Sequence, residues 1–270
     1  MIFVSSWGTI FVSNVGLSTL RSADGGKTWK ESHSLSIWRM SEDETSRTLY
    51  AGVYTRKQRP LFVAKLLRST DDGETWQTVF EDHRLDHIHS VRWDLRHNRL
   101  YISAGDGAHR GQAYSDDHGK TWTWINSGGK QGHTDVAISD RYVFWGSDDN
   151  LGRILRAPRT PVQDGETIMW APEHHIWWVV ADNRQIYAGT LTGARKKYTG
   201  AYLLASTDEG ATWQKLLEDS DGGAAHGAFH SESRQLSADG WLYCATSSGE
   251  AYRIRRVPGK EDSPRIPDEI

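Results

Sequence analysis

The chain of 270 residues has little of several things, and each scarcity excludes a class of protein. Its one cysteine, Cys244, excludes an internal disulfide, and the apolar residues around it predict a small buried side chain rather than a reactive thiol. Basic and acidic side chains number 32 and 35, a balance that argues against nucleic-acid binding. Apolar residues make up 37%, and no run approaches the length that spans a membrane.

Two further signals are missing. Residues 1–7 lack a basic segment followed by a long apolar run, so we expect either a cytoplasmic protein or an extracellular one whose leader has been removed. No segment shows the apolar period of an amphipathic helix, whereas short alternating and β-branched runs are frequent. The sequence therefore predicts an all-β protein, and we expect a monomer.

One short motif, Ser-x-Asp-x-Gly-x-Thr-Trp, occurs four times. The copies occupy residues 22–29, 69–76, 115–122 and 206–213. Their serines are 47, 46 and 91 residues apart, and the last step is close to two periods. A degenerate copy lies where the missing one is expected, with Asp164-Gly-Glu-Thr167 followed by Trp170. A repeat of this length filled with short strands predicts the blades of a β-propeller.

The third repeat shows the strand pattern of one blade. Strands are expected at Ser90–Asp94, Leu100–Ala104, Gln112–Ser115 and Thr121–Trp124, with the motif in the turn between the third and fourth. Segments like the second strand recur six times along the chain, which predicts a six-bladed propeller of four-stranded antiparallel blades, with five blades as the alternative. We place a single propeller domain at residues 1–257.

The two ends of the chain admit two arrangements. The tail, residues 258–270, supplies the outer strand of the last blade, or residues 2–5 close that blade instead of opening the first one.

Within each copy, the residue types suit a tight turn. An aspartate accepts backbone N–H groups of its own turn, a glycine permits positive φ, and the tryptophan anchors the blade while its indole N–H finds a carbonyl. The motif lacks the further ligands of a calcium loop. We therefore assign a structural role to its aspartates, Asp24, Asp71, Asp117 and Asp208.

Four copies of this motif resemble the Asp-box, or BNR, repeats of the sialidase-like propellers. The resemblance covers nearly the whole chain and implies the fold, with the boxes on the face opposite the ligand site. It implies less about function, because such boxes occur in enzymes and in binding proteins alike. The Arg-Ile-Pro motif of sialidases falls at residues 265–267, the wrong end of the chain, and no other sialidase catalytic position is matched.

Histidines gather in the loops that lead into the first strand of a blade. Equivalent positions in four blades superpose His89, His133, His175 and His226. Such a ring favours one divalent metal ion (Mn²⁺, Zn²⁺ or Ca²⁺), or acid–base catalysis by one or two histidines, such as His89 and His133, with Asp86, Asp135 or Glu173 as orienting carboxylate. Hydrogen bonding of each imidazole to nearby backbone is the simpler alternative.

Basic side chains lie in the loops expected on the same face. They are Arg56, Arg110, Arg195 and Lys197, and Tyr198 follows as a candidate catalytic base or nucleophile, because nearby positive charge favours its phenolate. Arginine binds carboxylates through two parallel hydrogen bonds, so this set predicts an acidic ligand. Solvated loop charge is the alternative interpretation.

Together these patterns favour a carbohydrate-active propeller that binds or acts on an acidic oligosaccharide or polysaccharide at a His-lined channel mouth. As an enzyme it would be a glycoside hydrolase or a polysaccharide lyase. The alternative is a non-catalytic Asp-box propeller that binds a protein or a glycan. No nucleic acid or membrane is expected as a partner.

Overall fold

Six antiparallel sheets follow one another along the chain in the computed structural model. The structure describes residues 1–54, 63–127, 134–147, 152–162, 165–170, 174–182, 185–192, 200–219, 229–230, 241–246 and 249–255. In each sheet the strands pair in chain order. Five sheets have four strands, and the sixth has three among the described residues.

The strands have the following bounds. The first sheet contains β1 (Ile2–Val4), β2 (Ile10–Val12), β3 (Thr19–Ser22) and β4 (Lys30–His33), and the second contains β5 (Ile37–Asp43), β6 (Thr48–Val53), β7 (Ala64–Ser69) and β8 (Gln77–Asp82). The third contains β9 (Ile88–Asp94), β10 (Arg99–Ala104), β11 (Gly111–Ser115) and β12 (Thr123–Ser127), and the fourth contains β13 (Asp135–Ile138), β14 (Tyr142–Gly146), β15 (Arg153–Pro158) and β16 (Glu166–Trp170). The fifth contains β17 (His174–Ala181), β18 (Ile186–Thr192), β19 (Ala201–Ser206) and β20 (Gln214–Asp219), and the sixth contains β21 (Phe229–His230), β22 (Trp241–Thr246) and β23 (Ala251–Arg255).

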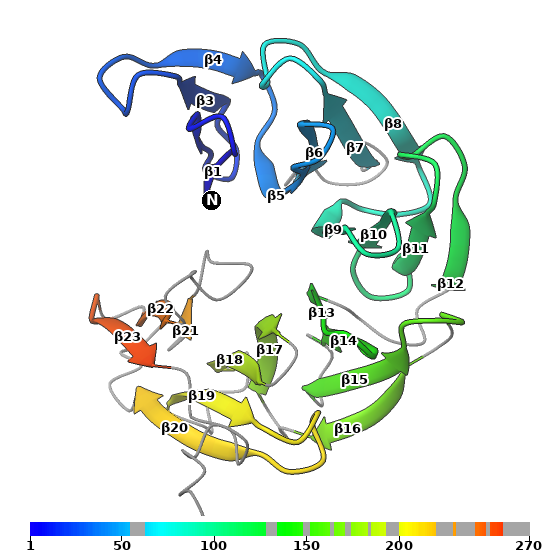
Figure 1. Ribbon diagram of the computed structural model, residues 1–270, viewed down its shortest axis with the longest axis vertical. Coiled ribbons are helices and arrows are strands. Elements are labelled where there is room, and N and C mark those ends of the chain that lie inside the picture. Colours follow the sequence, from blue (N-terminus) through cyan, green and yellow to red (C-terminus); the bar gives the residue numbers. More distant parts are fainter. Residues whose placement is uncertain are drawn as a thin grey trace, which may run out of the picture.

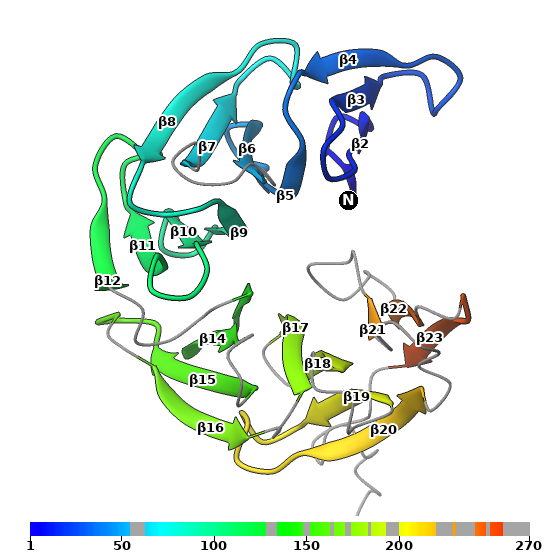
Figure 2. The ribbon, with the colours of Figure 1, turned by 180° about the vertical axis from the view of Figure 1, so that it is seen from behind.

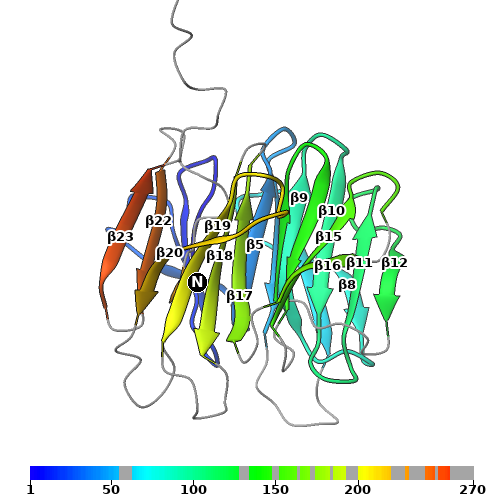
Figure 3. The same ribbon diagram turned by 90° about the horizontal axis from the view of Figure 1, so that it is seen from below.

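The six sheets stand in chain order around a common centre, as the blades of a propeller do (Figure 1). The first strand of each sheet lies nearest the centre, and the same arrangement is seen from behind (Figure 2). The strands run roughly along the axis of the ring, so their connecting turns gather at its two faces (Figure 3). The prediction of an all-β, six-bladed propeller is confirmed.

The N-terminal strand settles one of the open alternatives. Ile2 pairs with Val12 and Val4 pairs with Ile10, so β1 is the inner strand of the first sheet and does not close the sixth. Residues 256–270 lie outside the described residues, so an outer strand from the C-terminal tail stays a prediction. No described helix is long and apolar enough to cross a membrane.

The core lies between neighbouring sheets. One cluster joins Tyr50 and Leu66 of the second sheet to Val91 and Trp93 of the third. Such large apolar side chains, removed from water between two blades, supply most of the favourable free energy of folding. Cys244 is buried in a similar cluster, and burial raises the pKa of its thiol to about 11, as expected for a small core side chain.

The four complete Asp-boxes form one turn, repeated with the same hydrogen bonds. In the second sheet, Asp71 accepts bonds from the hydroxyl of Ser69 at 2.8 Å and from the backbone N–H and hydroxyl of Thr75 at 2.9 and 2.5 Å. The same bonds occur around Asp24, Asp117 and Asp208. The pKa values of Asp24 and Asp117 are each lowered to about 2, and the largest cause is the hydrogen bonding from Thr28 to Asp24 and from Thr121 to Asp117. Each of these aspartates therefore organises its own turn through the same hydrogen bonds.

The box also explains one misplaced strand boundary. Thr121 was expected to begin the fourth strand of the third blade, but its N–H and hydroxyl are bound to Asp117 within the turn. The strand β12 therefore begins two residues later, at Thr123. In the degenerate copy, Thr167 and Trp170 lie within the fourth strand, β16, and Asp164 lies outside the described residues.

Each later box docks on the blade before it. The residue preceding the box glycine has φ of 58° in Asp72, His118 and Glu209. Asp72 bonds to Arg21 at 3.0 Å, the His118 ring nitrogen lies 2.6 Å from the Tyr50 hydroxyl, and the Glu209 carbonyl accepts a bond from Arg156 at 2.8 Å. These partners belong to the first, second and fourth sheets, so each turn fastens its own sheet to its predecessor.

We predict that Asp71→Asn lowers the free energy of unfolding by about 1 kcal/mol, because an amide replaces one acceptor oxygen by a donor while solvent exposure weakens the bonds that are lost. Urea unfolding followed by tryptophan fluorescence measures this change. The pKa of Asp71 is lowered in the folded state, so its stabilisation is complete above the ordinary value of 3.8 and is lost as the pH falls below it.

The matched control is Asp140→Asn, because Asp140 forms an exposed ion pair with Arg96 at 3.1 Å. That change should leave stability nearly unaltered. Equal effects of the two substitutions at pH 7, or a loss at Asp71 that persists unchanged at pH 2, would contradict the structural role of the box.

Candidate functional site

The candidate site lies at the end of the third sheet opposite its Asp-box. Ile88 of β9 pairs with Ala104 of β10, and Ala104 pairs with Gly111 of β11, so residues 87–89 and the loop 105–110 share one end. The box turn, residues 116–122, connects the other ends of β11 and β12. We call the end with residues 87–89 and 105–110 the His face, and the end with the Asp-box turns the box face.

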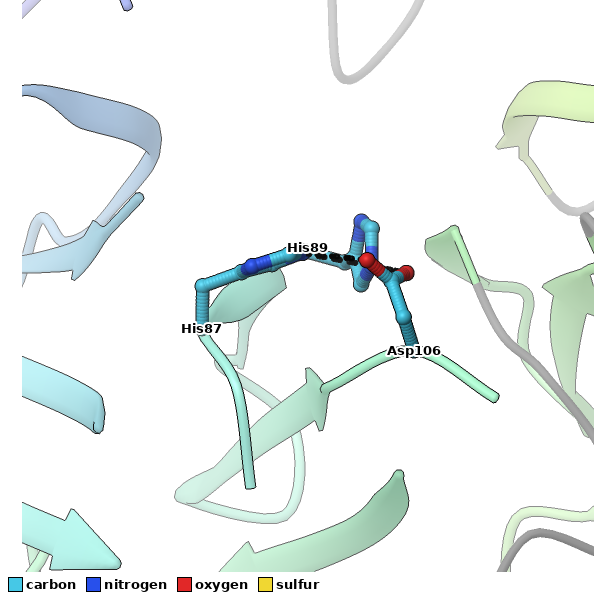
Figure 4. Close-up of side chains that lie close together, drawn as sticks. All are labelled: His87, His89 and Asp106. Atoms are coloured by element: carbon cyan, nitrogen blue, oxygen red, sulfur yellow. Dashed lines mark hydrogen bonds and ion pairs between the residues drawn. The ribbon is translucent and has the colours of Figure 1, made fainter. Parts of the chain in front are cut away.

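Two histidines and one aspartate meet on the His face. His87 and His89 are two residues apart at the start of β9, so their side chains leave the same side of an extended chain. Asp106 comes from the loop after β10, which is the neighbouring strand of the same sheet. Figure 4 shows the three side chains pointing toward one another.

The loop that carries Asp106 needs a glycine at its first position. Gly105 has φ of +79° and its N–H donates to the His87 carbonyl at 2.8 Å. A Cβ atom there would lie 1.7 Å from the carbonyl oxygen of His109. The loop closes further through a 2.9 Å bond from the His109 N–H to the Asp106 carbonyl. Gly105 therefore permits the close turn that brings Asp106 to the histidines.

The distances within the cluster are short. The Nε2 atoms of His87 and His89 are 3.0 Å apart, and Asp106 approaches them at 3.4 and 2.9 Å respectively. The histidines are buried, with 3% and 6% of their surface exposed, whereas the Asp106 side chain is 51% exposed. The cluster is thus enclosed on its histidine side and open to water on its carboxylate side.

Burial and charge set the ionisation of the cluster. Burial first, and then the neighbouring His89, lower the pKa of His87 to about 3, so its imidazole is neutral near pH 7. Burial alone would raise the pKa of Asp106, but its hydrogen bond to His89 and the nearby positive groups lower it to about 2. The site therefore offers one carboxylate and at least one neutral imidazole.

Aromatic side chains continue from this cluster toward the centre of the ring. The Tyr54 ring lies 4.0 Å from that of His87, and Trp38 stacks on Tyr54 at 4.8 Å. Trp38 in turn meets Trp177 edge-on at 6.0 Å. Trp38 belongs to β5 and Trp177 to β17, which face each other across the centre in Figure 1. The Trp38–Trp177 contact therefore bridges opposite blades.

Two arginines from neighbouring sheets approach the same face. Arg110 immediately precedes β11 and Arg153 begins β15, which places both at the His-face ends of their sheets. Burial is the larger cause that lowers the pKa of Arg153, and electrostatic repulsion from Arg110 is the second. The two guanidinium groups are therefore close enough to repel each other. Arg110 also contributes to the lowered pKa of Asp106. A region of positive charge therefore borders the cluster.

Asp135, the expected orienting carboxylate, has a different environment. It is fully buried, and its oxygens accept bonds from the Ser90 hydroxyl at 2.9 Å and from the Val136 and Val179 N–H groups at 3.0 and 3.3 Å. These partners come from the third, fourth and fifth sheets. Asp135 thus ties three blades together near the centre, which is a structural role that the sequence did not reveal.

The other expected site residues divide into two groups. His89 is in the cluster and Arg110 borders it, while His175 lies on β17 and is half-buried. Among the described residues, one group of three metal-ligating side chains has ligand atoms within 4.8 Å of one another, and His175 is not in it. The remaining expected residues lie outside the described part of the chain: Arg56, His133, Arg195, Lys197, Tyr198 and His226.

Sequence reasoning missed His87 and Asp106 as partners of His89. It compared equivalent positions around the ring, whereas the contacts form within one blade. The sequence pattern that indicates this site is local. It consists of two histidines two positions apart on a predicted strand, and an acidic residue just after the next strand, which pairs with the first.

Comparisons with known proteins agree with this geometry. Residues 113–123 match the family described as BNR/Asp-box repeat, and this segment contains the whole of the third box, residues 115–122. The chain carries the BNR/Asp-box repeat on a β-propeller fold. A search of curated protein sequences gives no match.

Solved structures with different descriptions share the fold. A GH74 enzyme of Niastella koreensis is 12% identical with a TM-score of 0.63, and the match covers 93% of this chain and 44% of that one. A chain of a nidogen/laminin complex (12% identical, TM-score 0.58) matches over 80% of this chain and 77% of its own. YCF48 bound to a D1 peptide (12% identical, TM-score 0.57) matches over 92% and 75%.

These similarities show the fold and leave the activity open. The chain spans less than half of the length of the GH74 enzyme. One relative is an enzyme by its description, and the other two are described in complexes. Whether this protein binds a ligand or catalyses a reaction therefore depends on the residues of the site itself.

We predict that Gly105→Ala destabilises the fold by more than about 1 kcal/mol, the usual cost of a left-handed residue with a side chain. The added Cβ also meets the His109 carbonyl, which displaces Asp106 from the histidines. Urea unfolding gives the free energy. Gly107→Ala is the control, because Gly107 has φ of +55° in the same loop and nothing lies within 4 Å of its Cβ position. Equal costs at the two positions would show that the close turn does not hold Asp106.

Proposed function

We propose that this propeller binds an acidic glycan on its His face, with Arg110 and Arg153 holding the carboxylate or sulfate groups. The observation that carries the proposal is the approach of two arginines from neighbouring sheets beside a half-exposed polar cluster. Two like charges that repel each other are stabilised by an anion placed between them. Arginine suits this task because its planar group makes paired bonds to carboxylates.

The aromatic side chains support a sugar rather than a simple anion as ligand. Trp38, Tyr54 and Trp177 are half-buried and line the way from the cluster to the centre of the ring. Aromatic rings combine an apolar surface with polar edges, which is the pattern of a sugar ring as well. This aromatic set contacts His87 and one of the arginines acts on Asp106, so both groups adjoin the same cluster in a chain with a net charge of −3.

Cleavage of the glycan is a second candidate, and the His89–Asp106 pair favours it. The Nε2 atom of His89 and Oδ1 of Asp106 are 2.9 Å apart, within the range required of a general acid or base and its orienting group. An arginine that neutralises a uronate would assist a lyase, and proton donation to the leaving oxygen would assist a hydrolase. Release of a sugar, or new absorbance from an unsaturated uronate, distinguishes these reactions from binding alone.

We predict that uronate-containing, sulfated or sialylated oligosaccharides bind more tightly than neutral ones of equal length. Arg110→Ala and Arg153→Ala should each weaken this binding about 10-fold or more, the loss of a hydrogen bond to a charged group. Isothermal titration calorimetry with the full chain measures both effects. Binding should also weaken as the salt concentration rises.

The matched control is Arg141→Ala. Arg141 is an exposed arginine in the turn between β13 and β14, on the box face, where it pairs with Glu209. It should leave glycan affinity unchanged. Equal affinity for neutral and acidic glycans would reject the role of the arginines. No binding across the panel would reject the glycan proposal and favour a protein partner.

A further inference from the structure

We propose that His87, His89 and Asp106 bind one divalent transition-metal ion. These residues are the one group of three metal-ligating side chains with converging ligand atoms in the described ranges. The set differs from the expected ring of histidines from four blades, since all three ligands belong to one sheet. The proposal concerns the third blade alone and does not depend on the binding of a glycan.

The spacing of the three ligand atoms fits a metal ion. Around an ion with bonds of about 2.1 Å, neighbouring ligand atoms lie about 3.0 Å apart in octahedral geometry and about 3.4 Å apart in tetrahedral geometry. The two Nε2 atoms are 3.0 Å apart, Nε2 of His89 lies 2.9 Å from Oδ1 of Asp106, and Nε2 of His87 lies 3.4 Å from Oδ2. With one carboxylate oxygen as the third ligand atom, all three ligand atoms lie within 4.8 Å of one another, close enough to converge on one ion.

Hydrogen bonds alone do not account well for the close approach of these three side chains. Nε2 of His89 lies within bonding distance of both the His87 nitrogen and Asp106, but a neutral imidazole has one hydrogen to share between its two nitrogens. A cation at the meeting point would satisfy both Nε2 lone pairs and the carboxylate together.

The residues around the cluster hold the three ligands in place and leave one side open to water. The ring of Tyr54 packs against His87, and Gly105 fixes the turn that carries Asp106. Such preorganisation limits the ordering entropy that binding costs. The half-exposed carboxylate gives the ion access from water, and three protein ligands leave coordination positions open for water or a further ligand.

The ligand types select the class of metal. Two imidazoles with one carboxylate suit Zn²⁺, Mn²⁺, Co²⁺ or Fe²⁺, whereas Ca²⁺ and Mg²⁺ prefer oxygen ligands throughout. A bound ion takes the Nε2 lone pair of His89. Metal binding and proton transfer by His89 therefore exclude each other.

The test titrates the full chain, freed of metal by a chelator, with Zn²⁺, Mn²⁺ or Co²⁺ alone in a calorimeter. We expect saturation at one equivalent, and visible absorbance from Co²⁺ held by nitrogen and oxygen ligands. Asp106→Asn and His89→Gln should each weaken affinity about 100-fold. The exposed His83, which lies 3.1 Å from Glu81, provides the control His83→Ala, and this change should leave affinity unaltered.

Three results would overturn the proposal: no saturable binding by the unaltered chain, equal affinity in Asp106→Asn, or a loss that His83→Ala reproduces. Circular dichroism of each variant shows whether the fold is retained, and the cobalt spectrum of the unaltered chain needs no variant. Glycan binding measured in the presence of chelator keeps the two proposals separate. Loss of one signal with retention of the other identifies which proposal fails.

Discussion

The packing of the Asp-box turn against the preceding blade is the contact on which this propeller depends. In each docked box a residue with φ of 58° is followed by a glycine that lies close to the preceding blade. A Cβ atom on Gly73 would lie 2.5 Å from Phe11, and one on Gly210 would lie 2.3 Å from Ile168. The aspartate organises the turn, and the glycine lets it approach the next sheet closely. One local motif thereby fixes both a turn and the relation of two blades.

This constraint leaves the opposite face available for a ligand. In an antiparallel blade the turn between the third and fourth strands and the loop between the second and third lie at opposite ends. The third sheet shows both, with Asp117 in its box turn and Asp106 in the other loop. The first aspartate accepts bonds from its own turn, whereas the second meets two histidines and stays half-exposed. The same residue type thus stabilises a turn at one end and forms part of a site at the other.

The repeat made the fold predictable, because it recurs at a fixed step and each residue of the box has one physical task. The blade count, the turn that holds each box and the structural role of Asp71 could all be inferred from the sequence. The site was harder to infer, because its partners are set by strand pairing: Asp106 meets His89 only because Ile88 pairs with Ala104 and Gly105 turns the chain. Asp135 is a second example. Its place two residues after His133 in the sequence gives no indication of its hydrogen bonds to groups of three blades.

Hydrogen–deuterium exchange of the full chain, with and without saturating metal and acidic glycan, tests the division between the two faces most directly. Slower exchange is expected at residues 87–89 and 105–111, with unchanged exchange in the box turns 70–76 and 116–122. Protection that appears in the box turns and is absent from residues 105–111 would show that the ligand binds at the box face, and the assignment of the two faces would be wrong.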